Sequence, residues 1–238
     1  MPRIHCPLPL AAGARVALPP AAARHVQVLR LQPGDALTLF SGAGGQWSAT
    51  VARMGRAQVE VEVGAHAAIE REAARAVHLA VGMPANERMD WLVEKAAELG
   101  AASIQPVTAA RSVLKLAGER ADKKVERWQS IAIAACEQCG RNRVPAVHAP
   151  LPLADWLRQG AGADGARLLL SLRAGAQPLR AAAGDAQTVW LLHGPEGGFT
   201  AREEDEALAQ GWRGASLGSR VLRAETASVA ALALLALE

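Results

Sequence analysis

Residues 190–199 read Trp-Leu-Leu-His-Gly-Pro-Glu-Gly-Gly-Phe, and Thr200-Ala201-Arg202-Glu203 follows directly. The apolar first residues are typical of a buried strand, and the glycines with Pro195 and Glu196 indicate a loop. Thr200 and Glu203 have the spacing of a capping box, which predicts the start of a helix. A buried strand, a glycine loop and a helix in this order favour a parallel α/β sheet.

This glycine loop is also a candidate ligand site. Ligands of open α/β sheets bind at the carboxyl ends of the strands, and glycine lets a ligand approach the backbone closely. The same spacing fits a tight turn with a solvated Glu196, and the spacing alone weighs the two interpretations evenly.

The neighbouring sequence repeats the order of strand and helix. An apolar run at 77–81 precedes a helical pattern that begins after Asn86, a candidate N-cap, and stops at Gly100. The helix expected over 226–237 is apolar nearly all round, so it must be buried, either in the core or against a second subunit. We expect a mostly parallel sheet covered on both faces; further strands are predicted at 104–107, 144–148, 167–172 and 189–192, and a further helix at about 121–138.

The first 72 residues have a different pattern. Residues 59–63 alternate strictly between valine and glutamate, which predicts a half-buried antiparallel strand. Short apolar runs at 36–40 and 46–51 are separated by glycine-rich turns, and one short helix is predicted at 21–29. This pattern favours a small β-barrel. The charged residues between 70 and 75 interrupt the pattern, so we place the domain boundary there, with domains at 1–72 and 73–238.

Composition limits the class of protein. Half of the 238 residues are apolar, and 26 Lys and Arg against 23 Asp and Glu give a formal charge of +3. This composition excludes a disordered chain, while the mild positive charge permits a basic face for nucleic acid without proving one. The N-terminus does not resemble a signal peptide, and the apolar run 227–237 is about half of a membrane span. We therefore expect a soluble, cytoplasmic protein that does not engage a membrane.

The three cysteines are too few for a disulfide framework in a chain of this length. Cys136 and Cys139 have the spacing of half a zinc site or of a redox pair. The sequence contains no second pair, so small buried residues are the favoured interpretation, and no metal is expected.

A second loop, Leu217-Gly218-Ser219-Arg220-Val221-Leu222-Arg223-Ala224-Glu225-Thr226, also links a predicted strand to a predicted helix. It brings charged side chains of both signs to the same edge of the sheet. A plain surface loop with paired charges is the alternative. Val221 and Leu222 argue against that alternative, because apolar residues in the middle of a loop favour burial.

Together, residues 194–199 and 217–227 resemble the RsmE family of SPOUT methyltransferases. The resemblance extends over nearly the whole chain. Three departures are His193, where the family more often has a small or aliphatic residue, Ala224 in place of threonine, and Cys139 in place of serine. The other matching segments are Val93–Gly100, Arg111-Ser112, Glu137-Gln138-Cys139-Gly140-Arg141, His25, Val28-Leu29-Arg30 and Gly34-Asp35.

The resemblance implies a PUA-like, RNA-binding β-barrel over 1–72 and a SPOUT methyltransferase domain over 73–238, with a C-terminal trefoil knot around the cofactor. Family members are homodimers that transfer a methyl group from S-adenosylmethionine to N3 of one uridine in 16S ribosomal RNA of the small ribosomal subunit. The residues assigned to the cofactor here are Leu170, Leu192, His193, Gly194, Glu196, Gly197, Leu217, Gly218 and Leu222.

The implied reaction needs a base, because uracil N3 carries a proton and is a poor nucleophile until that proton leaves. Glu225 is the candidate base, and Arg223 is the candidate group that stabilises the uracil anion. The candidate RNA-binding residues, which offer charge to phosphate groups, are Arg3, Arg24, His25, Arg30, Arg111 and Arg141, with Arg143 beside them. Two alternatives stay open: a SPOUT enzyme that acts on another RNA, and a non-catalytic RNA-binding protein of ribosome assembly.

Overall fold

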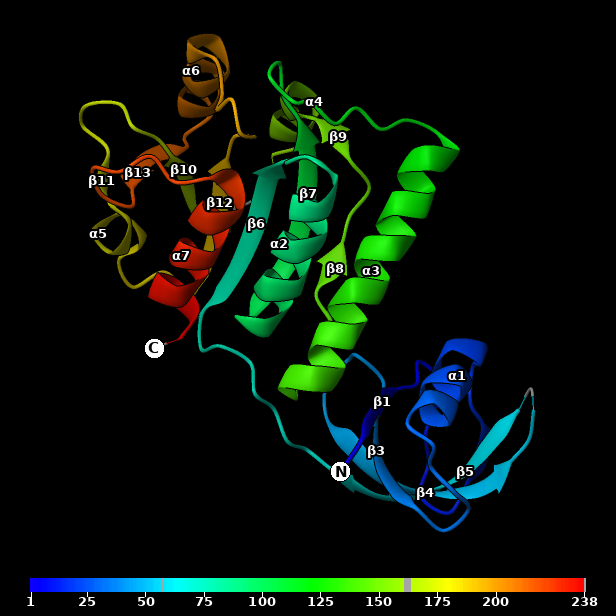
Figure 1. The fold of residues 1–238 in the computed structure, drawn as a ribbon. Coiled ribbons are helices and arrows are strands. Elements are labelled where there is room, and N and C mark those ends of the chain that lie inside the picture. The colour runs from blue at the N-terminus through cyan, green and yellow to red at the C-terminus, as the bar shows by residue number, and fades with distance from the viewer. Residues whose placement is uncertain (57, 161–163, 238) are drawn as a thin grey trace. The chain divides into compact units, whose positions relative to one another are not determined.

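The computed structural model describes residues 1–56, 58–160 and 164–237, which divide into two compact units (Figure 1). The first unit comprises Met1–Glu72 and Ile133–Val144, and the second comprises Ala73–Ala132 and Pro145–Glu238. Helix α3 (Glu119–Cys139) therefore contributes residues to both units. No helix in the described ranges is long and apolar enough to cross a membrane.

The first unit is a curved five-stranded sheet with one helix (Figure 1). The strand order is β1-β3-β4-β5-β2; β1 and β3 are parallel, and the other neighbours are antiparallel. The three strands and the helix that the sequence predicts here are all present. The elements are β1 (Arg3–His5), β2 (Arg15–Ala17), α1 (Pro20–Val28), β3 (Ala36–Phe40), β4 (Gln46–Met54) and β5 (Val59–Ala67).

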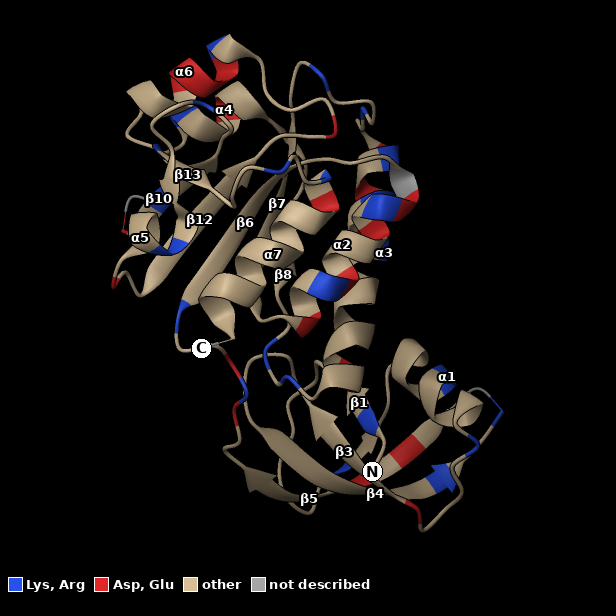
Figure 2. Cartoon of the chain, turned by 60° about the vertical axis from the view of Figure 1, so that its left-hand side comes forward, with Lys and Arg blue, Asp and Glu red and all other residues tan. Residues whose placement is uncertain are grey.

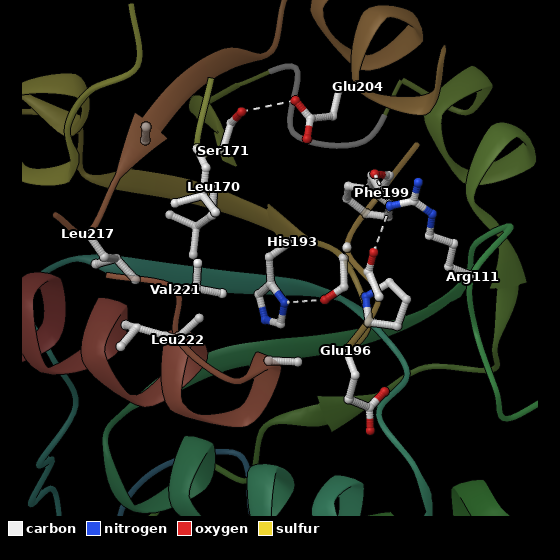
Figure 3. Close-up of a pocket in the computed structure, with 18 of the residues that line it drawn as sticks. Arg111, Leu170, Ser171, His193, Glu196, Phe199, Glu204, Leu217, Val221 and Leu222 are labelled. Atoms are coloured by element: carbon white, nitrogen blue, oxygen red, sulfur yellow. Dashed lines mark hydrogen bonds between the residues drawn. The ribbon is translucent and has the colours of Figure 1, made fainter. Parts of the chain in front are cut away.

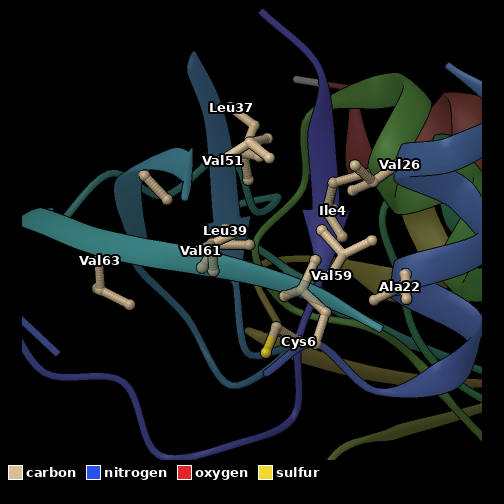
Figure 4. Close-up of a cluster of buried hydrophobic side chains, with 13 residues drawn as sticks. Ile4, Cys6, Ala22, Val26, Leu37, Leu39, Val51, Val59, Val61 and Val63 are labelled. Carbon is tan, nitrogen blue, oxygen red and sulfur yellow. The ribbon is translucent and has the colours of Figure 1, made fainter. Parts of the chain in front are cut away.

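Alternation along β5 builds the core of this unit. Val59, Val61 and Val63 are at most 1% exposed, whereas Glu62 on the opposite face is exposed. The valines pack with Ile4 of β1 and Val26 of α1, among others (Figure 4). One face of the sheet is thus apolar and covered by α1, as period-2 alternation predicts.

The second unit is built on a parallel sheet with the order β11-β13-β10-β12-β6-β7-β8, and β9 pairs with β7. The predicted α/β class is confirmed. The elements are β6 (Ala76–Gly82), α2 (Asn86–Glu98), β7 (Ala101–Thr108), β8 (Ala146–Val147), β9 (Leu151–Pro152), α4 (Leu153–Arg158), β10 (Ala166–Leu170), β11 (Gln177–Pro178), α5 (Leu179–Ala183), β12 (Thr188–His193), α6 (Ala201–Ala209), β13 (Arg213–Ser216) and α7 (Ala224–Ala236).

Helices cover both faces of this sheet. Helix α7 packs on α2 and β6, and α4, which packs on α6 and β7, belongs with β12 residue Leu192 to an apolar cluster on the other face. Burial on both sides is what makes the parallel strands continuous apolar runs. Helix α2 begins at Asn86, and its N-cap residue is Ala85, so the predicted N-cap at Asn86 is wrong by one residue.

Candidate functional site

A pocket of about 360 Å³ lies in the second unit, at the carboxyl ends of β10, β12 and β13 (Figure 3). Both loops singled out in the sequence line it, so Gly197 and Gly218 belong to one cavity. The lining residues are Arg111, Leu170, Ser171, Leu172, His193, Gly194, Pro195, Glu196, Gly197, Gly198, Phe199, Glu204, Ala215, Leu217, Gly218, Arg220, Val221, Leu222, Ala224 and Ala227.

Two glycines are required by the local backbone. A Cβ on Gly194 would lie 2.6 Å from the Phe199 nitrogen, because the first loop folds back on itself there. Gly218 has φ +107°, a conformation that residues with a side chain rarely adopt, and it faces open space. The loops can therefore present backbone groups to a ligand without side chains in the way.

One end of the pocket is apolar. Leu170, Leu217, Val221 and Leu222 gather there, and His193 lies between them and the glycine loop (Figure 3). Such a lining with few polar groups is typical of sites for small organic ligands. Val221 is 79% exposed, so the pocket is open on this side.

Leu192 is absent from the residues that line the pocket, and its assignment to the cofactor stays a prediction. Successive side chains of a strand point to opposite faces of the sheet. Leu192 is fully buried in the cluster with Trp156 and Phe199, while His193 points to the opposite face. Only one of these two neighbouring side chains can therefore point into the pocket.

His193 is held from both ring nitrogens. Nδ1 lies 3.0 Å from the Gly194 carbonyl oxygen, and Nε2 lies 2.6 Å from the Ser228 hydroxyl of α7. Burial lowers the pKa of His193, although the Gly194 carbonyl and Glu225 oppose this shift. In the neutral ring, Nδ1–H donates to Gly194, so Nε2 accepts a hydrogen bond from Ser228. His193 thereby ties the glycine loop to α7.

Glu196 lines the pocket, but its carboxylate points away from it (Figure 3). One oxygen accepts a hydrogen bond from the Ala85 nitrogen at 2.8 Å and lies 3.4 Å from Arg88 Nη1. Ala85 is the N-cap residue of α2, whose own side chain cannot cap. Glu196 therefore anchors the loop to the start of α2.

The two candidate catalytic residues lie at the start of α7 and outside the lining of the pocket. Arg223 is the exposed N-cap residue. Glu225 is buried, and its Oε1 lies 3.8 Å from Arg88 Nε. Its Oε2 is buried without a hydrogen-bond partner among the described residues. The guanidinium beside Glu225 is thus that of Arg88, not that of Arg223.

Sequence reasoning missed Arg88 and Glu204. Arg88 lies far from Glu225 in the chain, so only the packing of α2 on α7 brings them together. Glu204 lines the pocket, accepts from Ser171 Oγ at 2.9 Å and pairs with Arg173 at 2.8 Å. The sequence did contain a signal for Glu204, because this residue lies in the acidic first turn of the helix that follows the glycine loop.

The candidate RNA-binding residues fall into different environments. Arg111 lines the pocket and donates to the Gly197 carbonyl oxygen at 2.9 Å, while Arg24 and Arg30 are exposed. Arg3 donates to Asn142 Oδ1 at 2.6 Å, and His25 pairs with Glu137 at 3.0 Å.

Arg141 differs from the other candidate RNA-binding residues, because it is only 4% exposed and is paired with Glu72. Its side chain therefore supports the first unit and offers no surface charge to phosphate, which corrects its place in the RNA set. A buried pair of this kind is costly to break.

Cys136 and Cys139 lie in the last turn of α3. The hydrogen bond with Cys139, followed by burial, raises the pKa of the Cys136 thiol. A thiol that resists ionisation is a poor nucleophile and a poor metal ligand. Within the described ranges, no three His, Cys, Asp or Glu side chains are grouped to hold a metal ion.

Known proteins match both parts of this chain. Residues 71–236 match the RNA methyltransferase domain family, and residues 18–64 match the RNA methyltransferase PUA domain family. Ribosomal RNA small subunit methyltransferase E of Synechocystis is 35% identical over 87% of this chain and 67% of its own length. The Bacillus subtilis protein of the same name is 31% identical over 87% of this chain and 83% of its own.

This chain belongs to the ribosomal RNA small subunit methyltransferase E family. The structure of the Neisseria gonorrhoeae member, bound to S-adenosyl methionine, is 36% identical, covers 98% of this chain and 96% of that chain, and has a TM-score of 0.91. A Legionella pneumophila protein with bound SAM is 37% identical at the same coverage, with a TM-score of 0.93. Membership in the family confirms the resemblance seen in the sequence and the SPOUT class of the fold.

Proposed function

We propose that this protein transfers the methyl group of S-adenosylmethionine to N3 of a uridine in the 16S ribosomal RNA of the small ribosomal subunit. One observation carries the proposal. The two loops that resemble the family, 194–199 and 217–227, both line the same pocket at the carboxyl ends of the strands. Relatives of this family bind S-adenosyl methionine, and their name gives the small-subunit RNA as the substrate.

The pocket fits this cofactor. Leu170, Leu217 and Leu222 form an apolar slot for the adenine ring, and the glycine loops offer backbone hydrogen bonds at its edge. The carboxylate of Glu204 lies in the wall, where it is already paired with Arg173 and Ser171. When bound, the cofactor supplies an electrophilic methyl group on a sulfonium. His193, Gly194 and Glu196 hold the loop in the shape that receives it.

Glu225 is the residue that we propose to accept the proton of uracil N3. Its buried Oε2 has no hydrogen-bond partner within the described part of the chain, and such groups are normally satisfied by a partner or a ligand. We assign the stabilisation of the uracil anion to Arg88, because its guanidinium lies beside Glu225 whereas Arg223 points into solvent. The bound sulfonium would supply the methyl group to N3 and leave as its neutral thioether, while the proton would stay on the carboxylate.

The proposal includes the assembly and the place of the reaction. We propose a homodimer that buries apolar side chains exposed on the second unit, among them Leu172 at 67% and Leu237 at 62% exposure. We also propose that residues 1–72, with Arg24 and Arg30 exposed, form the PUA-like domain that binds RNA, and that the second domain is 73–238. Ribosomal RNA as substrate implies a cytoplasmic protein.

The test is methylation of defined RNA. Purified protein, S-adenosylmethionine with a labelled methyl group and unmodified 16S ribosomal RNA or small subunits are incubated, and nucleosides are analysed by mass spectrometry. We expect 3-methyluridine in 16S RNA. Gly194→Ala is expected to abolish the product, because its Cβ would lie 2.6 Å from the Phe199 nitrogen. Label in transfer RNA alone would indicate a different substrate, and no binding of the cofactor by calorimetry would indicate a non-catalytic protein.

A further inference from the structure

A second groove, of about 310 Å³, lies in the second unit beside the first turns of α3. Its walls are cationic and its remaining lining is leucine, and no residue of the cofactor pocket belongs to it. The lining residues are Leu114, Leu116, Arg120, Lys123, Lys124 and Arg127.

The four cationic side chains form one stripe of α3. They occupy positions i, i+3, i+4 and i+7, which lie on one face of a helix. Figure 2 shows Lys and Arg on the α3 turns at this end of the helix. The acidic residues of the same turns, at 119, 122 and 126, follow a separate spacing of three and four and so lie on a neighbouring face.

Much of this charge has no acidic partner among the described residues. Arg120 and Lys124 have no carboxylate partner in the parts of the chain that the structure describes, and Lys123 reaches Glu119 only at 4.0 Å between exposed side chains. Arg127 alone is closely paired, with Asp90 at 2.7 Å. The groove therefore offers at least two free cations to an anionic partner.

A continuous loop connects the groove to the cofactor pocket. Residues 109–118 run from the end of β7 to the start of α3 (Figure 1). Arg111, near the start of this loop, lines the pocket and donates to the Gly197 carbonyl oxygen, while Leu114 and Leu116 line the groove. A chain-like ligand that follows this loop passes from one site to the other.

We infer that the groove binds the sugar-phosphate backbone of a single-stranded RNA segment next to the nucleotide that enters the pocket. Regularly spaced cations suit phosphate groups, and apolar side chains between them suit riboses and base faces. An acidic peptide could also bind these cations. RNA is favoured because the loop 109–118 connects the groove to the pocket that we propose for the methyl donor. The inference rests on the proposed function, since it takes RNA as the substrate, and it moves part of the RNA contact from the first unit to α3.

The test compares two double variants with equal loss of charge. Arg120→Gln/Lys124→Gln removes free cations of the groove, and glutamine keeps a similar helix propensity. The matched control is Arg158→Gln/Arg202→Gln, two exposed arginines elsewhere in the second unit that are 71% and 89% exposed as side chains. Binding of a 16S ribosomal RNA transcript is measured by filter binding as a function of salt, with the wild-type protein alongside.

The groove variant is expected to reduce the slope of log affinity against log salt by about 1.4, at about 0.7 per single-strand contact, and to bind about 25-fold more weakly at 0.1 M salt. The control is expected to keep the wild-type slope. An unchanged slope in the groove variant, or an equal change in both variants, overturns the inference. Binding of an acidic peptide in place of RNA would do the same.

Failure of the proposed function is distinguishable from failure of the groove. If the wild-type protein binds the transcript through the groove but transfers no methyl group, the proposed function is wrong and the RNA surface stands. If the wild-type protein methylates the RNA and the groove variant binds as tightly, the groove is wrong and the function stands.

Discussion

Glu225 is the residue on which the proposed chemistry depends most. Glu225→Gln keeps the size of the side chain but removes the basic carboxylate, so we expect turnover to fall by about 10²- to 10⁴-fold, the usual contribution of a general base. Cofactor affinity should change little, because Glu225 does not line the pocket. Single-turnover kinetics and calorimetry measure the two quantities. Glu206→Gln, a partly exposed position of α6, is the control. Undiminished turnover in Glu225→Gln would remove this residue from the role.

His193 and Ser228 make a second prediction at the scale of single residues. His193→Leu, which restores a family-like aliphatic side chain, leaves the fully buried Ser228 hydroxyl without its 2.6 Å partner. We expect the free energy of unfolding to fall by about 2 kcal/mol, from the lost hydrogen bonds and the unsatisfied hydroxyl. The double variant with Ser228→Ala should recover about 1 kcal/mol, because no orphaned group then remains.

Urea denaturation of the wild type, both single variants and the double variant completes this cycle. Simple addition of the two single losses would contradict the assigned hydrogen bond. The same variants measured for cofactor affinity report whether the link from β12 to α7 also shapes the glycine loop.

The residues of the site differ in how far the sequence could predict them. His193, Gly194 and Gly218 follow from local patterns, because a strand end and a glycine loop are encoded by neighbours in the chain. The sequence does not show which face of the sheet the Leu192 side chain takes, because only the register of the strand in the sheet decides it. Arg88 could not be found at all, since its relation to Glu225 arises from the packing of two helices.

At the scale of elements, the cap of α6 connects helix stability to the site. Thr200 Oγ1 accepts from the Glu203 nitrogen, Glu203 Oε2 accepts from the Thr200 nitrogen at 2.8 Å, and Glu203 Oε1 accepts from the Ala110 nitrogen at 2.7 Å. Thr200→Ala is expected to cost about 1 kcal/mol of stability through the lost cap. Glu203→Ala should cost more, about 2 kcal/mol, because it also releases the loop that carries Arg111.

Thermal unfolding with and without cofactor measures both effects. Glu206→Ala, whose partner Arg202 is 89% exposed as a side chain, serves as the control and should stay within about 0.5 kcal/mol of the wild type. Equal losses for Thr200→Ala and Glu203→Ala would show that the bond to Ala110 contributes nothing.

The two helix starts show why one cap was predictable and the other was not. The capping box of α6 lies within four consecutive residues, so the sequence displays it, and the structure confirms it. Helix α2 takes its cap from Glu196 of a distant loop, with Ala85 as the N-cap residue. Asn86 was predicted as the N-cap because its residue type is typical of N-caps, and the local sequence gives no sign of the contact with Glu196. Tertiary capping of this kind has no local signature.

At the scale of the whole molecule, the division into units depends on contacts that the sequence does not display. The segment 133–144 belongs to the first unit, where Arg3 donates to Asn142 Oδ1 and Arg71 donates to the Gly140 carbonyl oxygen at 2.9 Å. Pattern changes near residue 72 indicate where one architecture ends. They carry no information about a later segment that returns to the first unit, because that return is fixed by side chains far apart in the chain.

Stability of the whole chain should fall in mild acid. Burial lowers the pKa values of His5, His78 and His193. Below the ordinary pKa of about 6.5, the unfolded chain binds protons at these rings while the folded protein does not. The free energy of unfolding therefore decreases as pH falls below about 6.5, by at most about 1.4 kcal/mol per pH unit for each histidine, until each folded-state pKa is reached. His193 should come nearest to this limit, because it is only 3% exposed.

The contribution of His193 can be isolated in the second unit, which contains five of the chain's six tryptophans, so that tryptophan fluorescence follows mainly its unfolding. Urea denaturation at pH 7.5 and at pH 5.5 gives the pH dependence for the wild type and for His193→Leu/Ser228→Ala, which lacks the titrating ring and leaves no unsatisfied hydroxyl. The wild type should lose more stability between the two pH values than the double variant does. Identical losses would mean that the His193 ring takes up its proton equally well in the folded and the unfolded protein. That result would contradict the assignment of a neutral ring that links Gly194 to Ser228.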